Sequence, residues 1–252
     1  MSLELSQLAA LIRDARSIFL FTGAGVSTGS GIPDFRGPNG VWKRRLPVYY
    51  HDFMSSEAAR VEHWDYKLEG WSSFRDAIPN PAHAACVDLE RAGRLELLLT
   101  QNIDGLHQRA GVSRERLVEI HGTNNEIECQ SCGARSEPED AFREFEATRK
   151  PPACPCGGWL KPATISFGQN LRVEDLSRAE QGARNSDLII SLGSSLSVTP
   201  AASFPLLGAR GGAPYAIVNR GPTDHDAREE VTLRIEGDVI DVFPAAVREA
   251  LT

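Results

Sequence analysis

Short apolar runs, separated by long polar or amphipathic stretches, are the dominant pattern of this 252-residue chain. Four runs stand out, at 18–21, 95–99, 188–192 and 215–218. Each run is nearly continuous in apolar residues and is followed by a polar or glycine-bearing turn. Strands that are buried on both faces of a parallel sheet have this pattern. The chain is therefore expected to contain a parallel β-sheet.

Helical periodicity fills much of the sequence between these runs. Apolar residues at helical spacing in the first dozen positions predict a helix that packs beneath the first strand. Crossover helices are expected at 82–92, 173–185 and 200–209, and a closing amphipathic helix at 241–251. Strands that alternate with helices predict an α/β fold built on a Rossmann-like parallel sheet.

Two segments do not fit this alternation. Residues 41–80 contain three of the four tryptophans and many polar residues, which predicts a helical insertion. Residues 124–160 contain four of the five cysteines and a Pro-Pro turn, which predicts a small zinc-binding module. The Rossmann-like domain would then consist of 1–40, 81–123 and 161–252. Ligands of such sheets bind at the carboxyl ends of the strands, so we expect a cleft there between the two insertions.

A glycine-rich loop follows the first apolar run. Residues 23–37 contain the pattern G-x-G-x-x-x-G-x-G and then Pro-Asp-Phe-Arg-Gly. Glycine loops between a strand and a helix hold pyrophosphates, although a structural turn is the alternative. The glycine spacing differs from that of the dinucleotide-binding fingerprint. That fingerprint also has an acidic residue about 20 positions after its glycines, and here a basic run at 43–45 lies in that region. The adjacent carboxylate, aromatic ring and guanidinium of Asp34, Phe35 and Arg36 favour a ligand site.

Composition excludes several classes of protein. With 41% apolar and 24% charged residues, the chain has an ordinary globular composition, and its length permits one large α/β domain. The net charge of −7 argues against a general nucleic-acid surface. No apolar stretch reaches the roughly 18 residues that span a bilayer, and charged residues interrupt any signal-peptide pattern. We therefore expect a cytoplasmic protein without membrane or nucleic-acid partners. Arginine far outnumbers lysine, which favours a GC-rich bacterial source.

The cysteines form two closely spaced pairs, Cys129-x-x-Cys132 and Cys154-x-Cys156, each followed by glycine. Two such knuckles predict a single tetrahedral Zn²⁺ site. Disulfides and coincidence are the alternatives, but a chain without a secretion signal usually keeps its thiols reduced. Four thiolates leave no open coordination position, so the metal is expected to be structural. Cys86 lies in a helical segment and is expected in the core.

Polar side chains follow two further apolar segments. The run at 95–99 leads into Thr-Gln-Asn-Ile-Asp, which places Gln101, Asn102 and Asp104 at the mouth of the sheet. Asp104 could instead cap a helix. The segment 117–120 ends in His121, which is followed by glycine. A lone histidine is more often structural, but at a strand end beside a cleft His121 fits a general base.

These motifs together resemble the sirtuin family of NAD-dependent protein deacylases over nearly the whole chain. The resemblance implies that NAD is consumed as a co-substrate and that an acyl-lysine peptide binds as an added strand near Gly168 and Val198. It implies that His121 is the general base on a ribose hydroxyl, that Asn102 is also catalytic, and that one structural Zn²⁺ is present. The products would be lysine, nicotinamide and O-acyl-ADP-ribose. The implied NAD contacts are Gly23, Ala24, Gly25, Ser27, Asp34, Phe35, Arg36, Gln101, Asn102, Asp104, Gly193, Ser194, Ser195, Asn219 and Val239.

Two features bear on the substrate and the reaction. Sirtuins that remove acidic acyl groups typically have a tyrosine with an arginine three residues later, and no tyrosine here has that partner. Its absence favours acetyl or another neutral acyl group.

The alternatives to a deacylase are a mono-ADP-ribosyltransferase on the same fold and a non-enzymatic NAD sensor. His121 favours the deacylase, because deacylation requires a base that a transferase can omit.

Overall fold

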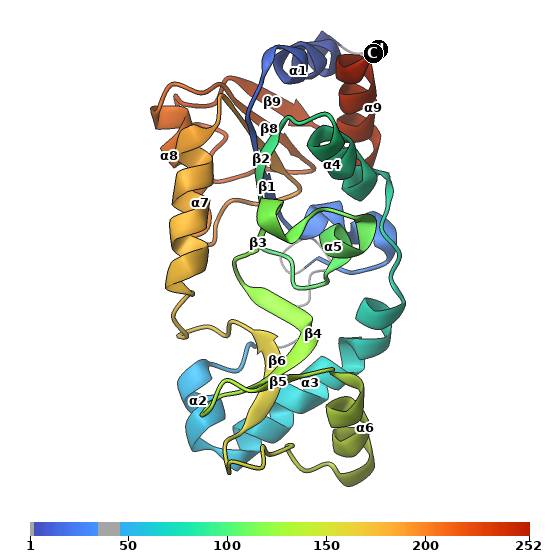
Figure 1. The fold of residues 1–252 in the computed structure, drawn as a ribbon, viewed down its shortest axis with the longest axis vertical. Helices are drawn as coiled ribbons and strands as arrows, with labels where there is room; N and C mark the ends of the chain where they lie inside the picture. Colours follow the sequence, from blue (N-terminus) through green and yellow to red (C-terminus); the bar gives the residue numbers. More distant parts are fainter. Residues whose placement is uncertain (1–2, 35–45) are drawn as a thin grey trace.

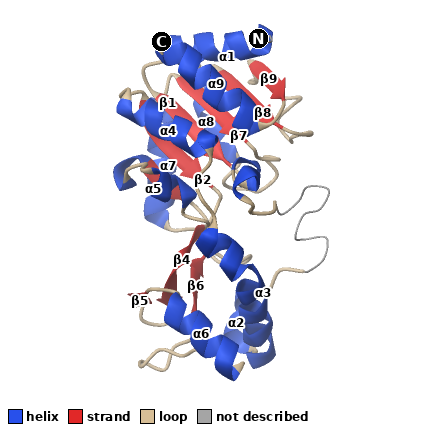
Figure 2. Cartoon of the chain, turned by 90° about the vertical axis from the view of Figure 1, so that its right-hand side faces the viewer, coloured by secondary structure: helices blue, strands red, loops and turns tan. Residues whose placement is uncertain are grey.

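The structure is a computed structural model that describes residues 3–34 and 46–252. Two lobes lie one above the other along the long axis of the molecule (Figure 1). The upper lobe contains a six-stranded sheet, and the lower lobe contains a three-stranded sheet. Both chain termini lie at the top of the upper lobe, far from the lower lobe (Figure 2).

All strands of the six-stranded sheet are parallel, and their order is β3-β2-β1-β7-β8-β9. From β1 the chain first adds β2 and β3 on one side of the sheet. It then returns to add β7, β8 and β9 on the other side. This reversal beside β1 creates the crevice in which such sheets bind ligands. The strands are β1 (Ile18–Thr22), β2 (Leu95–Thr100), β3 (Leu117–Glu119), β7 (Leu188–Leu192), β8 (Tyr215–Asn219) and β9 (Leu233–Glu236).

Helices cover both faces of this sheet. One face packs against α1 (Leu3–Asp14), α4 (Pro81–Arg91) and α9 (Val239–Leu251), and the other against α7 (Val173–Asn185) and α8 (Ser203–Arg210) (Figure 2). Successive residues of β1 point to opposite faces, as strand geometry requires. All five residues of β1 are buried. The continuous apolar runs therefore arise because each central strand has a core on both sides.

The lower lobe joins the two expected insertions in one core. Trp64 packs edge-on against Phe142, and its indole N–H donates to the carbonyl of Leu160 at 3.1 Å. This lobe contains α2 (Tyr50–Ser55), α3 (Glu57–Asp76), α6 (Glu139–Thr148) and an antiparallel sheet of order β5-β4-β6, with β4 (Gly122–Cys129), β5 (Arg135–Ser136) and β6 (Leu160–Thr164). The expected boundary between the zinc-binding module (124–160) and the last part of the Rossmann-like domain (161–252) therefore falls inside β6.

Most predicted elements are present, with ends shifted by a few residues. The sequence pattern did not predict β9 or the antiparallel sheet. Within the glycine-rich loop the chain forms two 3₁₀ turns, Ala24–Val26 and Thr28–Ser30. The remaining short elements are α5 (Leu106–Ala110) and a 3₁₀ turn at Arg114–Arg116.

Candidate functional site

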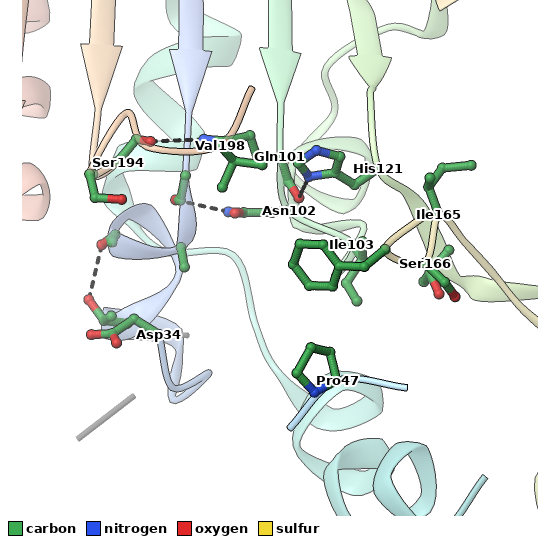
Figure 3. A pocket seen from close by; sticks show the side chains of 18 of the residues that line it. Asp34, Pro47, Gln101, Asn102, Ile103, His121, Ile165, Ser166, Ser194 and Val198 are labelled. Carbon is green, nitrogen blue, oxygen red and sulfur yellow. Dashed lines mark hydrogen bonds between the residues drawn. The ribbon is translucent and has the colours of Figure 1, made fainter. Parts of the chain in front are cut away.

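A cavity of about 1050 Å³ lies between the two lobes at the carboxyl ends of the parallel strands. Its upper wall is formed by the loops after β1, β2, β7 and β8, and its lower wall by residues 46–48, one face of α3, residues 164–169 and Leu171 (Figure 3). The predicted residues that line it are Gly23, Ala24, Gly25, Asp34, Gln101, Asn102, His121, Gly193, Ser194, Ser195, Asn219 and Val239.

The glycines of two neighbouring loops pack against each other at the upper wall. The Gly25 amide donates to the carbonyl of Gly193 at 2.8 Å. A β carbon on Gly25 would lie 2.7 Å from the α carbon of Gly193, and one on Gly23 would lie 2.7 Å from the Gly193 carbonyl oxygen. Gly193 itself has a φ of +61°, which favours glycine. These glycines are therefore required for contact between the loops, whatever ligand the cavity holds.

A buried hydrogen-bond chain supports the loop after β1. The Asn102 amide nitrogen donates to the Gly23 carbonyl and to the Ser27 hydroxyl, both at 3.1 Å. Ser27 in turn donates to a carboxylate oxygen of Asp104 at 2.7 Å. The other Asp104 oxygen accepts from the amide of Leu106, the first residue of α5, at 2.9 Å, whereas the N-cap position of this helix is Gly105. Burial raises the pKa of Asp104 above its usual range.

The hydrogen-bond chain from Asn102 to Asp104 separates the predicted site residues into two groups. Asn102 lines the cavity, whereas Ser27 and Asp104 are buried behind the loop and are not among the described residues that line it. Asp34 lies on the wall. The predicted contacts Phe35 and Arg36 lie outside the described residues.

His121 lies at the end of the β3 segment and points into the cavity (Figure 3). Its Nδ1 lies 3.2 Å from the backbone carbonyl oxygen of Gln101. A carbonyl oxygen can only accept, so Nδ1 carries the proton and Nε2 carries the lone pair of the neutral ring. The Gln101 side chain donates to the Ser194 hydroxyl at 2.8 Å. The carboxyl ends of β2 and β7 are thereby linked beside His121.

The far end of the cavity is formed by the loops after β8 and β9. The side-chain nitrogen of Asn219 donates to the carbonyls of Arg220 and Gly221 at 3.1 and 3.0 Å. Asp238 caps α9 by accepting from the Ile240 amide, which leaves Val239 at the first turn of the helix on the cavity wall. Asn219 and Val239 thus both line this end of the cavity.

The lower wall contains basic residues that the sequence analysis did not select. His63 and Lys67 lie one turn apart on α3, and both line the cavity. Burial, together with the charge of Lys161, lowers the pKa of Lys67 to about 7. The i, i+4 spacing of His63 and Lys67 on a predicted helix was the available signal. The sequence alone did not show which face of that helix points into the cavity.

The four predicted cysteine ligands meet at the edge of the lower lobe, where all their Sγ atoms lie within 4.8 Å of one another. The Cys129–Cys156 and Cys132–Cys154 sulfur pairs are 3.5 and 3.9 Å apart. A tetrahedral Zn²⁺ with Zn–S bonds of about 2.3 Å requires sulfurs about 3.8 Å apart. The cysteines therefore fit a closed zinc site. Cys86 is fully buried in the upper core, as expected.

Comparison with known proteins identifies the family. Residues 23–200, from the glycine loop to the loop after β7, match the family model described as Sir2 family. The chain belongs to the Sir2 family. Among curated sirtuins it is 40% identical over 238 residues to NAD-dependent protein deacetylase 1 of Bradyrhizobium diazoefficiens, covering 94% of each chain. It is 38% identical over 248 residues to the NAD-dependent protein deacetylase of Thermotoga maritima, covering 98% of each chain.

Solved sirtuin structures share the whole fold. A Sir2 complex with a p53 peptide and NAD⁺ superimposes with a TM-score of 0.87 at 35% identity, covering 98% of both chains. A Sir2 complex with a deacetylated p53 peptide and 3′-O-acetyl-ADP-ribose gives a TM-score of 0.89 at 36% identity, again covering 98% of both chains. These values establish that both lobes of the chain have the sirtuin arrangement. Within the described residues, no helix combines the length and apolar character needed to cross a membrane.

Proposed function

We propose that this sirtuin is an NAD-dependent protein-lysine deacetylase that transfers the acetyl group to ADP-ribose. The observation that carries the proposal is the placement of His121 and Asn102 in one cavity with the glycine loop of a parallel sheet. Sirtuins with this fold are named NAD-dependent protein deacetylases, and related structures hold NAD⁺, a peptide and acetyl-ADP-ribose.

The reaction consumes three reactants and is not a redox reaction. Acetyl-lysine, NAD⁺ and one water give protonated lysine, nicotinamide and O-acetyl-ADP-ribose. The lysine amide bond and the nicotinamide–ribose bond break. The acetyl carbon forms an ester bond to a ribose hydroxyl oxygen, the ribose carbon that loses nicotinamide gains a hydroxyl, and one proton from the ribose hydroxyl and one from the water go to the lysine nitrogen. When bound, NAD⁺ supplies both the carbon that nicotinamide leaves and the hydroxyl that receives the acetyl group.

His121 is the general base in this proposal. The Gln101 carbonyl holds the Nδ1 proton, so Nε2 is the atom that accepts the ribose hydroxyl proton. Asn102 is the second catalytic residue of this proposal. Its side-chain amide is oriented by its hydrogen bonds to Gly23 and Ser27. Asp104, fixed behind Ser27, is a positioning residue in this arrangement, because its carboxylate oxygens accept from Ser27 and Leu106.

The NAD contacts follow the upper wall from end to end. The phosphates lie against Gly23, Ala24 and Gly25, with Gly193, Ser194 and Ser195 on the adjacent strand end. Asn219 and Val239 flank the adenosine, and Gln101 lies toward the nicotinamide ribose. Asp34, Phe35 and Arg36 cover the nicotinamide side in the same proposal. The support is the cavity lining, to which all of these except the undescribed Phe35 and Arg36 contribute.

The acyl-lysine peptide enters between the lobes. Gly168 and Val198 lie on the cavity wall and come from different lobes, which suits an extended peptide that pairs with both.

The cysteine cluster holds one structural Zn²⁺ that stabilises the lower lobe. We assign the upper lobe to NAD, the lower lobe to structural support of the peptide groove, and the enzyme to the cytoplasm. Cell fractionation tests the last assignment.

The mass of the peptide product distinguishes this function from ADP-ribosyl transfer. Purified protein is incubated with NAD⁺ and an acetyl-lysine peptide, and the peptide is analysed by mass spectrometry. Deacetylation predicts a peptide that has lost one acetyl group. A peptide that retains its acetyl group and gains ADP-ribose would instead identify a mono-ADP-ribosyltransferase. NAD⁺ binding without nicotinamide release would indicate a sensor.

A further inference from the structure

A buried polar network lies in the core of the upper lobe, outside the cavity. Tyr215, the first residue of β8, is fully buried in the apolar core that includes residues of α7 and α8. Its hydroxyl lies 2.9 Å from the Ser191 hydroxyl of β7 and 3.0 Å from Nδ1 of His225. Ser191 and His225 are also buried, at 1% and 4% exposed. Polar groups in such a core need partners, and these three side chains supply partners for one another.

The tyrosine ring extends from the amino end of β8 toward the carboxyl ends of the strands. Tyr215 pairs with Ile189 in the parallel register, so Ser191 lies two residues closer to the carboxyl end of β7. The hydroxyl beside Ser191 is therefore directed toward the edge of the sheet at which the cavity lies. His225 belongs to the loop 220–232, between β8 and β9, and it contacts the hydroxyl there. The network thus anchors this loop to the core.

The loop that contains His225 also forms part of the cavity. Residues 220–222, at its start, line the end of the cavity that we assign to the adenosine. The Asp224 amide donates to the carbonyl of Ser195 at 3.0 Å, and Ser195 lies on the wall that we assign to the phosphates. Because Asp224 and His225 are adjacent, one anchor in the core holds both parts of this wall.

A second set of bonds cross-links residues 220–226. The Thr223 amide and hydroxyl donate to the two carboxylate oxygens of Asp226 at 2.9 and 2.5 Å. Arg234 of β9 donates to Asp226 at 2.8 Å and to the carbonyl of Gly221 at 2.6 Å. A segment cross-linked in this way moves as one piece, so a displacement of His225 is expected to reach the cavity wall.

Resting on the proposed function, we infer that His225, held by Tyr215, is a positioning residue for the ADP-ribose part of NAD⁺. His225 is not among the described residues that line the cavity, so it acts through the loop that it anchors. The anchor sets the adenosine wall relative to the phosphate wall, and thereby the affinity for a ligand that contacts both. Loss of the anchor weakens this binding and leaves the chemistry at His121 unchanged.

The first test compares His225→Leu, which removes the bond to Tyr215, with the matched variant His225→Asn. Burial lowers the pKa of His225, so the ring is neutral at pH 7, and the neutral asparagine amide carries its polar atoms near the position of Nδ1. His225→Leu should raise the Kd for ADP-ribose and the KM for NAD⁺ by about tenfold, with kcat and the KM for the peptide unchanged. His225→Asn should restore near wild-type values. An unchanged Kd in His225→Leu, or an equal rise in His225→Asn, would overturn the inference.

Tyr215→Phe tests the same bond from its other partner, because it removes the hydroxyl and keeps the ring. The double variant Tyr215→Phe/His225→Leu should bind ADP-ribose as weakly as either single variant, since both substitutions remove one shared interaction. Losses that add would show that the two residues act separately, and would contradict the inference.

A third measurement uses the wild type alone and so holds even where the variants fail to fold. Hydrogen exchange is followed by mass spectrometry with and without saturating ADP-ribose. The peptide that contains Asp224 and His225 should exchange more slowly in the complex, and unchanged exchange there would contradict the inference. If ADP-ribose binds in this way but NAD⁺ and an acetyl-lysine peptide release no nicotinamide, the failure concerns the proposed function and not the anchor.

Discussion

Gly25 and Gly193 are in direct backbone contact, although 168 positions of sequence separate them: the amide of one donates to the carbonyl of the other at 2.8 Å. Neither position has room for a β carbon, because the nearest backbone atoms would lie at 2.7 and 2.6 Å. The contact brings the ends of β1 and β7 together where the strand order reverses. The shape of the upper wall therefore depends on two residues without side chains.

This contact predicts a stability cost for Gly25→Ala. The added methyl group meets backbone, which cannot move aside as a flexible side chain would, so we expect a loss of about 1–3 kcal/mol in the free energy of unfolding. Urea denaturation measures it. The matched control is Gly70→Ala within α3, where a β carbon would lie 3.5 Å from Phe74. That substitution should instead stabilise the protein by about 0.5–1 kcal/mol. Effects of equal sign in the two variants would contradict this account of the loop.

The assignment of His121 as general base predicts that His121→Ala removes deacetylation. General-base catalysis contributes roughly 10²–10⁴-fold, so kcat should fall by at least that factor. The fold and zinc content should persist, because His121 lines the cavity and is not a core residue. His51→Ala, at an exposed position on α2, is the control and should keep wild-type turnover. Turnover near wild type in His121→Ala would show that another group is the base.

Much of the upper lobe could be predicted from local sequence. The run at 188–192 predicted a strand with the bounds that β7 has, and residues 173–185 predicted α7. Buried central strands have apolar residues on both faces, so their pattern is visible without knowledge of their neighbours. The edge strand β9 has the sequence Leu-Arg-Ile-Glu and is only partly buried. Its short, mixed pattern carries too little signal for a prediction.

Two buried histidines predict a loss of stability in acid. Burial lowers the pKa of His83 to about 4, and burial also lowers that of His107, whose Nε2 lies 3.0 Å from the Thr22 hydroxyl. In the unfolded chain both titrate near 6.5, so the contribution of each is complete above about 6.5 and is lost as pH falls toward its lowered folded-state pKa, which for His83 is about 4. Unfolding at pH 7 and pH 5 measures the loss.

The size of this effect can be isolated with one variant. For His83 alone, the shift corresponds to about 2 kcal/mol between pH 7 and pH 5. In His83→Gln, which cannot take up that proton, the difference in unfolding free energy between the two pH values should be smaller by about this amount. An equal difference in both proteins would mean that His83 is protonated equally in the folded and unfolded states.

The cysteine cluster predicts one zinc per chain after purification under reducing conditions. Cys132→Ala should lower the zinc content well below one, because a structural site requires all four ligands. The lower lobe should then lose stability, seen as a change in tryptophan fluorescence from the buried Trp64. The control variant Cys86→Ala, which changes a residue of the upper core, should keep one zinc per chain. Full zinc content in Cys132→Ala would contradict the ligand assignment.

The candidate site was predictable where side chains follow strand ends and was not predictable elsewhere. Asn102 and His121 follow strands of a parallel sheet, so their meeting at one edge follows from topology. Asp104 also follows a strand, but its carboxylate accepts from Ser27 and Leu106 behind the loop. Lys67 reaches the cavity only because α3 packs on the antiparallel sheet of the other insertion. That long-range contact leaves no local pattern.

The stoichiometry of the products tests the central claim most directly. The claim is that NAD⁺ and acyl-lysine react together in the cavity beside His121. Wild-type enzyme is incubated with NAD⁺ and an acetyl-lysine peptide, and nicotinamide, O-acetyl-ADP-ribose and deacetylated peptide are quantified by mass spectrometry over time. The account predicts equal amounts of all three at every time point. Deacetylated peptide that accumulates with free acetate and without nicotinamide would contradict it.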